Sequence, residues 1–237
     1  MDYRLILILS LFLSACSSAP LEPGEDTQQA TEASLDTATD EGEWIQIFDG
    51  AILDGWVATA KMDAFSVQDG ALYCDGSGGG ILYYEPQQFQ DFVLETEVKV
   101  TEGANSGIFF RMSDPSDPVQ TGIEIQVLDS YGKEELSTHD FGAVYDISAP
   151  TANPSLPPGE WNQVRLTAEE TRITVEINGQ VVNDIDLSEW TEAGRNPDGT
   201  PNKFNTAYRE MTQSGYIGFQ DHGNPVWYRN VRVKLLQ

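Results

Sequence analysis

Polar and apolar positions between residues 44 and 237 alternate with the two-residue period of β-strands, without helical periodicity between them. Residues 91–100 show the pattern most clearly. One set there is Phe92, Leu94, Thr96, Val98 and Val100, and it alternates with Val93, Glu95, Glu97 and Lys99. A strand of this kind has one buried and one hydrated face, so the pattern predicts an antiparallel sheet with one face turned to the core.

Further strands are predicted at intervals set by turn residues. They cover residues 44–48, 65–73, 80–83, 106–111, 122–128, 141–145, 161–167, 172–177, 180–187, 215–220 and 226–235. Asn178-Gly179 joins two of them as a favoured hairpin turn. Many strands without helices predict an all-β, two-sheet jelly-roll sandwich.

Residues 188–213 break this rhythm with a segment rich in Pro, Asn, Asp and Gly, so one long loop insertion is expected there. Its aromatic residues are Trp190, Phe204 and Tyr208. We expect them to pin the loop to the core rather than to stack on a sugar ring.

The first 16 residues predict export. A short apolar run over residues 5–13 follows Arg4, and Leu13-Ser14-Ala15-Cys16 has the pattern of a bacterial lipobox. The run is too short for a permanent membrane span, so a signal peptide ending at a lipidated Cys16 is expected, with an ordinary signal peptide as the alternative. Ser17 after the cysteine is typical of lipoproteins sent to the outer membrane, which predicts a cell-envelope lipoprotein.

Composition divides the remaining chain into a tether and a folded domain, and the net charge argues against a nucleic acid partner. Residues 17–43 are acidic and lack Lys and Arg, which predicts a disordered tether before the folded domain of residues 44–237. The formal net charge of −25 repels phosphate, so no nucleic acid partner is expected, and contact with membrane is expected only through the lipid anchor. Cys74 is the only other cysteine and is expected to be a buried small hydrophobe.

Polar side chains on three predicted strands supply the candidate chemistry. Glu124 and Gln126 share a strand face opposite Ile123, Ile125 and Val127. A second strand begins after Asn105 and ends at Arg111, and a third ends in Gln220-Asp221-His222-Gly223. A carboxylate, amides, a guanidinium and an imidazole together can hold a polyhydroxylated ligand and move a proton on it.

These blocks occur in an order that resembles the 3-keto-disaccharide hydrolase domain family, which was long a domain of unknown function. The matching segments are Phe48-Asp49-Gly50, Leu53-Asp54-Gly55-Trp56, residues 105–111, residues 122–129, residues 142–146, Trp161-Asn162, Asn178-Gly179, residues 218–223 and Tyr228-Arg229-Asn230. The resemblance covers residues 44–236. It implies a concanavalin A-like jelly roll that cleaves glycosides whose sugar has been oxidised at carbon 3, and therefore a sugar 3-oxidoreductase acting upstream.

A ketone at carbon 3 acidifies the hydrogen at carbon 2, so the glycosidic bond can break by elimination, followed by addition of water. Such a site needs a base, a group that stabilises the enolate oxygen, and an acid for the leaving group. The candidate base is Glu124 or His222, with Arg111 stabilising the enolate. Substrate-binding roles are expected for Asn105, Gln126, Tyr145, Gln220 and Asp129.

Purely structural roles for the same residues stay open. Arg111 and Glu124 can form a buried ion pair, and Asn105 and Asp129 can serve as turn residues. No cofactor is expected, although Glu124, Asp129, Asp221 and His222 offer ligands for a divalent ion such as calcium. A lectin-like carbohydrate-binding module and a structural surface lipoprotein are the non-catalytic alternatives. The amide at Gln126 counts against the paired acids of a retaining glucanase.

Overall fold

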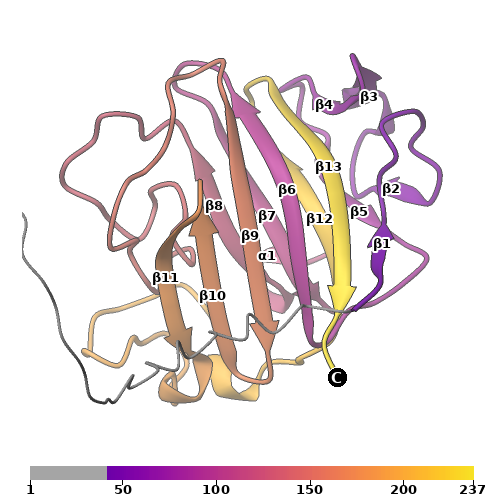
Figure 1. Cartoon of the computed structure of the whole chain (residues 1–237). Coiled ribbons are helices and arrows are strands. Elements are labelled where there is room, and N and C mark those ends of the chain that lie inside the picture. Colours follow the sequence, from indigo (N-terminus) through magenta and orange to yellow (C-terminus); the bar gives the residue numbers. More distant parts are fainter. Residues whose placement is uncertain (1–41) are drawn as a thin grey trace, which may run out of the picture. The chain divides into compact units, whose positions relative to one another are not determined.

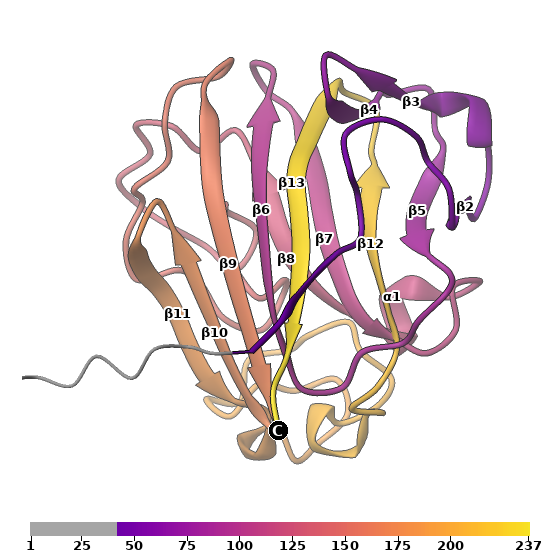
Figure 2. The same cartoon turned by 45° about the vertical axis from the view of Figure 1, so that its right-hand side comes forward.

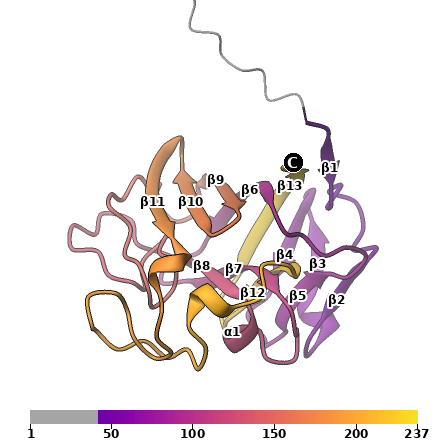
Figure 3. The same ribbon diagram turned by 90° about the horizontal axis from the view of Figure 1, so that it is seen from below.

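Alternating side chains build two antiparallel sheets in residues 42–237, the part of the chain that the computed structural model describes. Sheet A has the strand order β11-β10-β9-β6-β13-β4-β3, and β1 also pairs with β13. Sheet B has the order β2-β5-β12-β7-β8. Viewed from below, the sheets form two layers (Figure 3). The sandwich predicted from the alternation is confirmed.

The strands of the two sheets are short. Those of sheet A are β1 (Trp44–Gln46), β3 (Phe65–Gln68), β4 (Ala71–Cys74), β6 (Phe92–Val100), β9 (Trp161–Glu169), β10 (Arg172–Ile177), β11 (Gln180–Asp186) and β13 (Val226–Leu235). Those of sheet B are β2 (Trp56–Ala58), β5 (Gly80–Tyr84), β7 (Asn105–Met112), β8 (Ile123–Leu128) and β12 (Tyr216–Asp221). Figure 1 labels these strands and colours the chain from the N-terminus to the C-terminus.

The core lies between the two sheets. In β6, Leu94 and Val98 are buried and Glu95, Glu97 and Lys99 are half-buried, as the sequence pattern predicts. The apolar residues of β8, on sheet B, enter the same cluster of apolar side chains. Burying a side chain of this size contributes about 1.5–3 kcal/mol, which is why the alternation sets the inward face of each strand.

Two of the predicted strands need correction. Residues 65–73 are two strands, β3 and β4, because Asp69 and Gly70 have φ of 50° and 78° and make a two-residue turn between them. The Asn178-Gly179 turn between β10 and β11 is confirmed, with φ of 51° and 79°. The expected strand at residues 141–145 is not a regular strand, although it hydrogen-bonds along the outer edge of β8. The sequence analysis also missed β2 and the short helix α1 (Pro118–Thr121).

The long segment after β11 is a loop with two short 3-10 turns, η2 (Leu187–Glu189) and η3 (Tyr208–Glu210), and a third such turn, η1 (Met62–Ala64), precedes β3. Trp190, Phe204 and Tyr208 are buried, and the rings of Phe204 and Tyr208 meet edge to face with centroids 4.9 Å apart. The expectation that these aromatics pin the loop to the core is confirmed. Figure 2 shows this orange to yellow loop running below the strands toward β12.

Some of the sequence predictions concern residues outside the part of the chain that the structure describes. The signal peptide, the lipidation of Cys16 and nearly all of the acidic tether were predicted for residues that lie outside 42–237, so they stay predictions. Within those residues, no helix is long and apolar enough to cross a membrane. Cys74 is fully buried, as expected for a small hydrophobe, and burial is the main cause that raises the pKa of its thiol.

Candidate active site

The outer face of sheet B, turned away from sheet A, carries most of the predicted site. Glu124 and Gln126 of β8 lie directly opposite Phe109 and Gly107 of β7 in the antiparallel register. The apolar residues between and beside them on β8 point into the core. The two-residue period therefore turns the carboxylate and the amide outward together, as expected.

Glu124 is the side chain with the most unusual environment on this face. The residue is only 9% exposed, and no donor among residues 42–237 hydrogen-bonds to its carboxylate. Burial raises its pKa from 4.5 to about 7, and the positive charge of Lys203 opposes this rise. A carboxyl group with this pKa exchanges a proton readily at neutral pH, which suits a general base or acid.

Gly107 gives the Glu124 carboxylate its space. A Cβ atom at position 107 would collide with Oε1 of Glu124 and would lie 2.9 Å from its Cδ. The glycine in Asn105-Ser106-Gly107 thus allows the carboxylate to lie over the neighbouring strand.

Three amide side chains share this face with the carboxylate. Nε2 of Gln126 donates to Oδ1 of Asn105 at 2.7 Å, so the structure brings these two predicted residues together. Gln220 belongs to β12, where Gly218 lies opposite Phe109. Continued by two residues, the same register places Gln220 opposite Gly107, on the face that carries Gln126.

His222 lies at the end of this arrangement. It is exposed and follows directly after β12, and the register continued to it reaches Asn105. The structure therefore puts His222 beyond the end of β12 on the Asn105 side, whereas Glu124 is buried on the edge strand β8. The two candidate bases therefore differ in exposure, since Glu124 is buried and His222 is exposed to solvent.

A cation and an aromatic ring complete the surroundings of Glu124. The backbone N–H of Tyr145 donates to the Glu124 carbonyl oxygen at 2.9 Å, which places Tyr145 beside Glu124 at the edge of β8. Nζ of Lys203 lies 3.9 Å from the centroid of the Tyr145 ring. The ring of His139 also packs against the Tyr145 ring, with centroids 4.7 Å apart.

Both backbone polar groups of Lys203 form hydrogen bonds with side chains. Its N–H donates to Oδ2 of Asp146 at 2.8 Å, and its carbonyl accepts from Nε2 of Gln120 at 3.1 Å. Oδ1 of Asp146 lies 3.1 Å from Nε2 of His139, so the aspartate links two loops. These bonds fix the backbone of a lysine whose side chain is exposed.

Arg111 is placed elsewhere, which corrects the expectation that it faces Glu124. Its guanidinium is 1% exposed and donates to the carbonyls of Gln90 and Glu170 at 2.9 and 2.7 Å and to Oδ1 of Asp91 at 3.0 Å. Asp91 precedes β6, and Glu170 lies in the turn between β9 and β10 of sheet A. Arg111 has a φ of 49° beside an irregularity in the pairing of β7 with β12, and its side chain joins the two sheets.

The acidic residues considered as metal ligands are also dispersed. Oδ2 of Asp129 accepts from the N–H of Gly103 at 2.9 Å, which makes Asp129 a turn residue rather than part of the polar face. Oδ2 of Asp221 accepts from the N–H groups of Gly78 and Gly79 at 3.0 and 2.7 Å. Within the described residues, no group of three or more His, Cys, Asp and Glu side chains is placed to hold a metal ion.

The sequence analysis missed two residues near Glu124. Lys203 lies in a polar loop with no periodicity, so no sequence signal indicated its position. Tyr208 was assigned to packing only; burial first, then the charges of Glu124 and Asp146, raise the pKa of its phenol well above the usual range. Both come from the long loop, whose length was the one available sign of function.

Comparisons with known proteins agree with this architecture. The family of 3-keto-alpha-glucoside-1,2-lyase-like domains matches residues 43–234. A 3-keto-disaccharide hydrolase of Bacteroides thetaiotaomicron is 28% identical over 241 residues, covering 86% of this chain and 82% of that protein. A crystal structure of a proposed glycosyl hydrolase from Parabacteroides distasonis superposes with a TM-score of 0.74 at 27% identity, covering 82% of this chain and 100% of that one.

A more distant structure supports the fold alone. A Bacillus subtilis protein of unknown function with a galectin-like fold has a TM-score of 0.52 at 14% identity and covers 81% of this chain and 94% of that one. The family match extends over nearly all described residues and confirms both the resemblance read from the sequence and the expectation of an enzyme that acts on glycosyl bonds. The chain belongs to the family of 3-keto-alpha-glucoside-1,2-lyase-like domains.

Proposed function

We propose that this enzyme cleaves the glycosidic bond of 3-keto-glycosides, including 3-keto-disaccharides, with Glu124 as the base. The observation that carries the proposal is the buried Glu124 carboxylate, whose pKa is about 7 and which has no hydrogen-bond donor among residues 42–237. The family and the 3-keto-disaccharide hydrolase that resembles this chain support the substrate class.

In the first step, Glu124 takes the proton from carbon 2, and the C–H electron pair forms an enolate with the ketone at carbon 3. The enolate then expels the glycosidic oxygen from carbon 1, leaving a double bond between carbons 1 and 2. The departing oxygen takes up a proton from an acid. Water next adds its oxygen to carbon 1 and a proton to carbon 2, so the overall reaction is hydrolysis.

The surrounding groups suit the other needs of this reaction. The positive charge of Lys203 lowers the pKa of Glu124, and Lys203 replaces Arg111 as our candidate for stabilising the negative enolate oxygen. The face also offers amides that can donate to and accept from sugar hydroxyls, and a tyrosine whose backbone is hydrogen-bonded to that of Glu124. These are the side chains of Asn105, Gln126, Gln220 and Tyr145. The ketone must be made by an oxidation at carbon 3, so an oxidoreductase acting upstream is part of the proposal.

Substrate specificity tests the reaction class. Incubation with 3-keto-glucosides and with their unoxidised parents should give cleavage of the keto series only, because only a ketone acidifies the carbon 2 hydrogen. Product release is measured by chromatography, and exchange of the carbon 2 hydrogen for deuterium is followed by NMR. Equal cleavage of both series would reject elimination. Binding of the keto sugar without turnover or exchange would instead favour the lectin-like alternative.

The role of Lys203 gives a separate prediction. Lys203→Met should lower kcat on a 3-keto-glucoside by about 10²-fold, the usual cost of removing one group that stabilises an oxyanion. The same change removes a positive charge that lowers the pKa of Glu124, so the rising limb of the pH–rate profile should move to higher pH.

Lys61→Met is the matched control, because Nζ of Lys61 only donates to the Ser77 carbonyl on the exposed surface. It should leave both kcat and the pH profile unchanged. A Lys203→Met enzyme with normal kcat and an unshifted profile would remove Lys203 from the site.

A further inference from the structure

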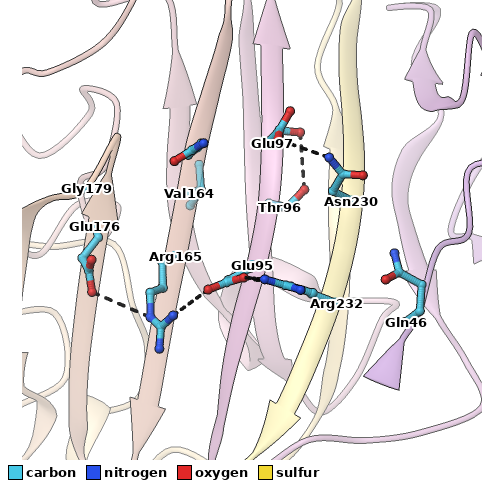
Figure 4. A pocket seen from close by; sticks show the side chains of 11 residues that line it. Gln46, Glu95, Thr96, Glu97, Val164, Arg165, Glu176, Gly179, Asn230 and Arg232 are labelled. Atoms are coloured by element: carbon cyan, nitrogen blue, oxygen red, sulfur yellow. Dashed lines mark hydrogen bonds and ion pairs between the residues drawn. The ribbon is translucent and has the colours of Figure 1, made fainter. Parts of the chain in front are cut away.

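A hollow lined by residues of five strands lies on the outer face of sheet A, on the side of the sandwich opposite Glu124. Its volume is about 470 Å³, within the range of about 300–1,000 Å³ that is typical of small-ligand sites. Side chains of β1, β6, β9, β10 and β13 line it, and nearly all of them are polar. Figure 4 shows these side chains spread across the strands.

One row of directly paired residues forms the floor of this hollow, which we call the sheet A groove. Across β10, β9, β6, β13 and β1 the register aligns Glu176, Arg165, Glu95, Arg232 and Gln46. Acidic and basic side chains alternate along the row, and an amide ends it (Figure 4). Strands about 4.8 Å apart make such a row about 19 Å long, enough to lie under several sugar rings.

Hydrogen bonds hold these planar groups in fixed positions. Oε1 of Glu95 accepts from Nη1 of Arg165 at 2.5 Å, and Oε2 accepts from Nε and Nη2 of Arg232 at 2.8 and 2.5 Å. Beside the row, the two oxygens of Glu97 accept from Asn230 and Arg229 at 3.1 and 2.5 Å. Fixed donors and acceptors bind a ligand with less loss of side-chain entropy than mobile ones.

Beyond the row that contains Glu97 on this face lies a row of three aromatic rings and a lysine. Trp161, Lys99, Trp227 and Tyr73 lie opposite one another on β9, β6, β13 and β4. The rings of Tyr73 and Trp227 have centroids 5.0 Å apart, and Nζ of Lys99 lies 4.4 Å from the Trp227 ring centroid and 4.9 Å from that of Trp161. These part-exposed rings give the same face of sheet A an apolar area beyond the polar groove.

We propose that the sheet A groove binds a neutral oligosaccharide, as a second carbohydrate site separate from the catalytic face. Sugar hydroxyls donate and accept at every ring, which matches a floor that offers carboxylate acceptors and guanidinium donors on successive strands. An acidic chain with a net charge of −25 disfavours an anionic ligand. The polar floor lacks the apolar pockets that anchor protein partners.

The proposal extends the carbohydrate chemistry of the proposed function but does not depend on the elimination reaction. The test uses unoxidised sugars and measures binding, so its failure is distinct from a failure to cleave keto sugars. Exposed ion pairs contribute little to stability, which allows variants of the row to fold. Arg172 is a matched control, because it forms an equivalent pair with Asp184 between β10 and β11 and does not line the groove.

The experiment is an NMR titration of the ¹⁵N-labelled protein with maltohexaose, cellohexaose, laminarihexaose and xylohexaose. At least one hexaose should bind, should shift resonances of β6, β9 and β13, and should bind more tightly than the corresponding disaccharide. Arg232→Met and Glu95→Gln should each weaken binding by about ten-fold, as expected for lost hydrogen bonds to charged groups. Arg172→Met and Glu124→Gln should retain the wild-type affinity.

Several results would overturn the proposal. These are the absence of binding by all four hexaoses at millimolar concentration, shifts confined to residues around Glu124, or unchanged affinity in both groove variants. A wild type that binds only an acidic oligosaccharide or a peptide in the groove would also overturn it. Cleavage of a small 3-keto-disaccharide by the groove variants should be normal, and a normal rate would show that any lost binding does not come from unfolding.

Discussion

Glutamine in place of Glu124 is expected to lower kcat on a 3-keto-glucoside by about 10²- to 10⁴-fold, the range that a positioned general base contributes. Glutamine matches the shape of glutamate but cannot take the carbon 2 proton. In the wild type, kcat/KM should rise with pH through a midpoint of about 7, as the carboxyl group loses its proton. The variant should lose this rising limb, which a pH series of initial rates measures.

The same substitution should make the protein more stable at alkaline pH. Burial raises the pKa of Glu124 from 4.5 to about 7, so the folded protein binds this proton more tightly than the unfolded chain does. Ionisation therefore costs stability as the pH rises through this window, by about 3 kcal/mol when complete. Glu124→Gln should recover most of that free energy of unfolding at pH 8 and little at pH 4, as urea denaturation at both values would measure.

Two companion variants make the result specific. Glu134→Gln removes an exposed carboxylate and should change neither activity nor stability. His222→Ala tests the other candidate base at the end of β12. An active Glu124→Gln enzyme beside an inactive, folded His222→Ala enzyme would transfer the role of base to His222. A stability gain without a loss of activity would leave Glu124 as a buried acid with no part in catalysis.

Arg111→Met should have the opposite signature, with a large loss of stability and little effect on catalysis by the folded molecules. The change removes the guanidinium donors that bind two carbonyl oxygens and Oδ1 of Asp91 at 2.7 to 3.0 Å. Removing one partner of a buried ion pair usually costs about 3–5 kcal/mol. Urea denaturation measures this loss, and initial rates at low temperature give kcat of the folded protein.

Arg111→Lys keeps the charge and provides a milder variant if the methionine variant does not fold. Lysine lacks the planar fork that serves three acceptors, so an intermediate loss of stability is expected. Arg172→Met is the exposed control; its pair with Asp184 is solvent-screened, so its loss should change the free energy of unfolding little. A fall in kcat by orders of magnitude in a stable Arg111 variant would show that Arg111 takes part in catalysis.

Glu124 and Arg111 show where sequence reasoning succeeded and where it stopped. Glu124 was found because alternation along one strand determines the face that its side chain joins. Arg111 should face the same way by alternation from Asn105, but its φ of 49° and the irregular pairing of β7 with β12 break that alternation. A single irregular residue is enough to send the guanidinium to the opposite side of the strand.

The sequence by itself determined the sandwich, the inward faces of its long strands, the Asn178-Gly179 turn and the family resemblance, because these depend on periodicity and short local motifs. Only the tertiary structure decided which distant residues meet. Lys203 reaches Tyr145 and affects Glu124 through loops that carry no period, and the alternating row on the floor of the sheet A groove exists only once five strands pair in register. Such contacts depend on how strands and loops from remote parts of the chain are packed together, and local patterns do not encode that packing.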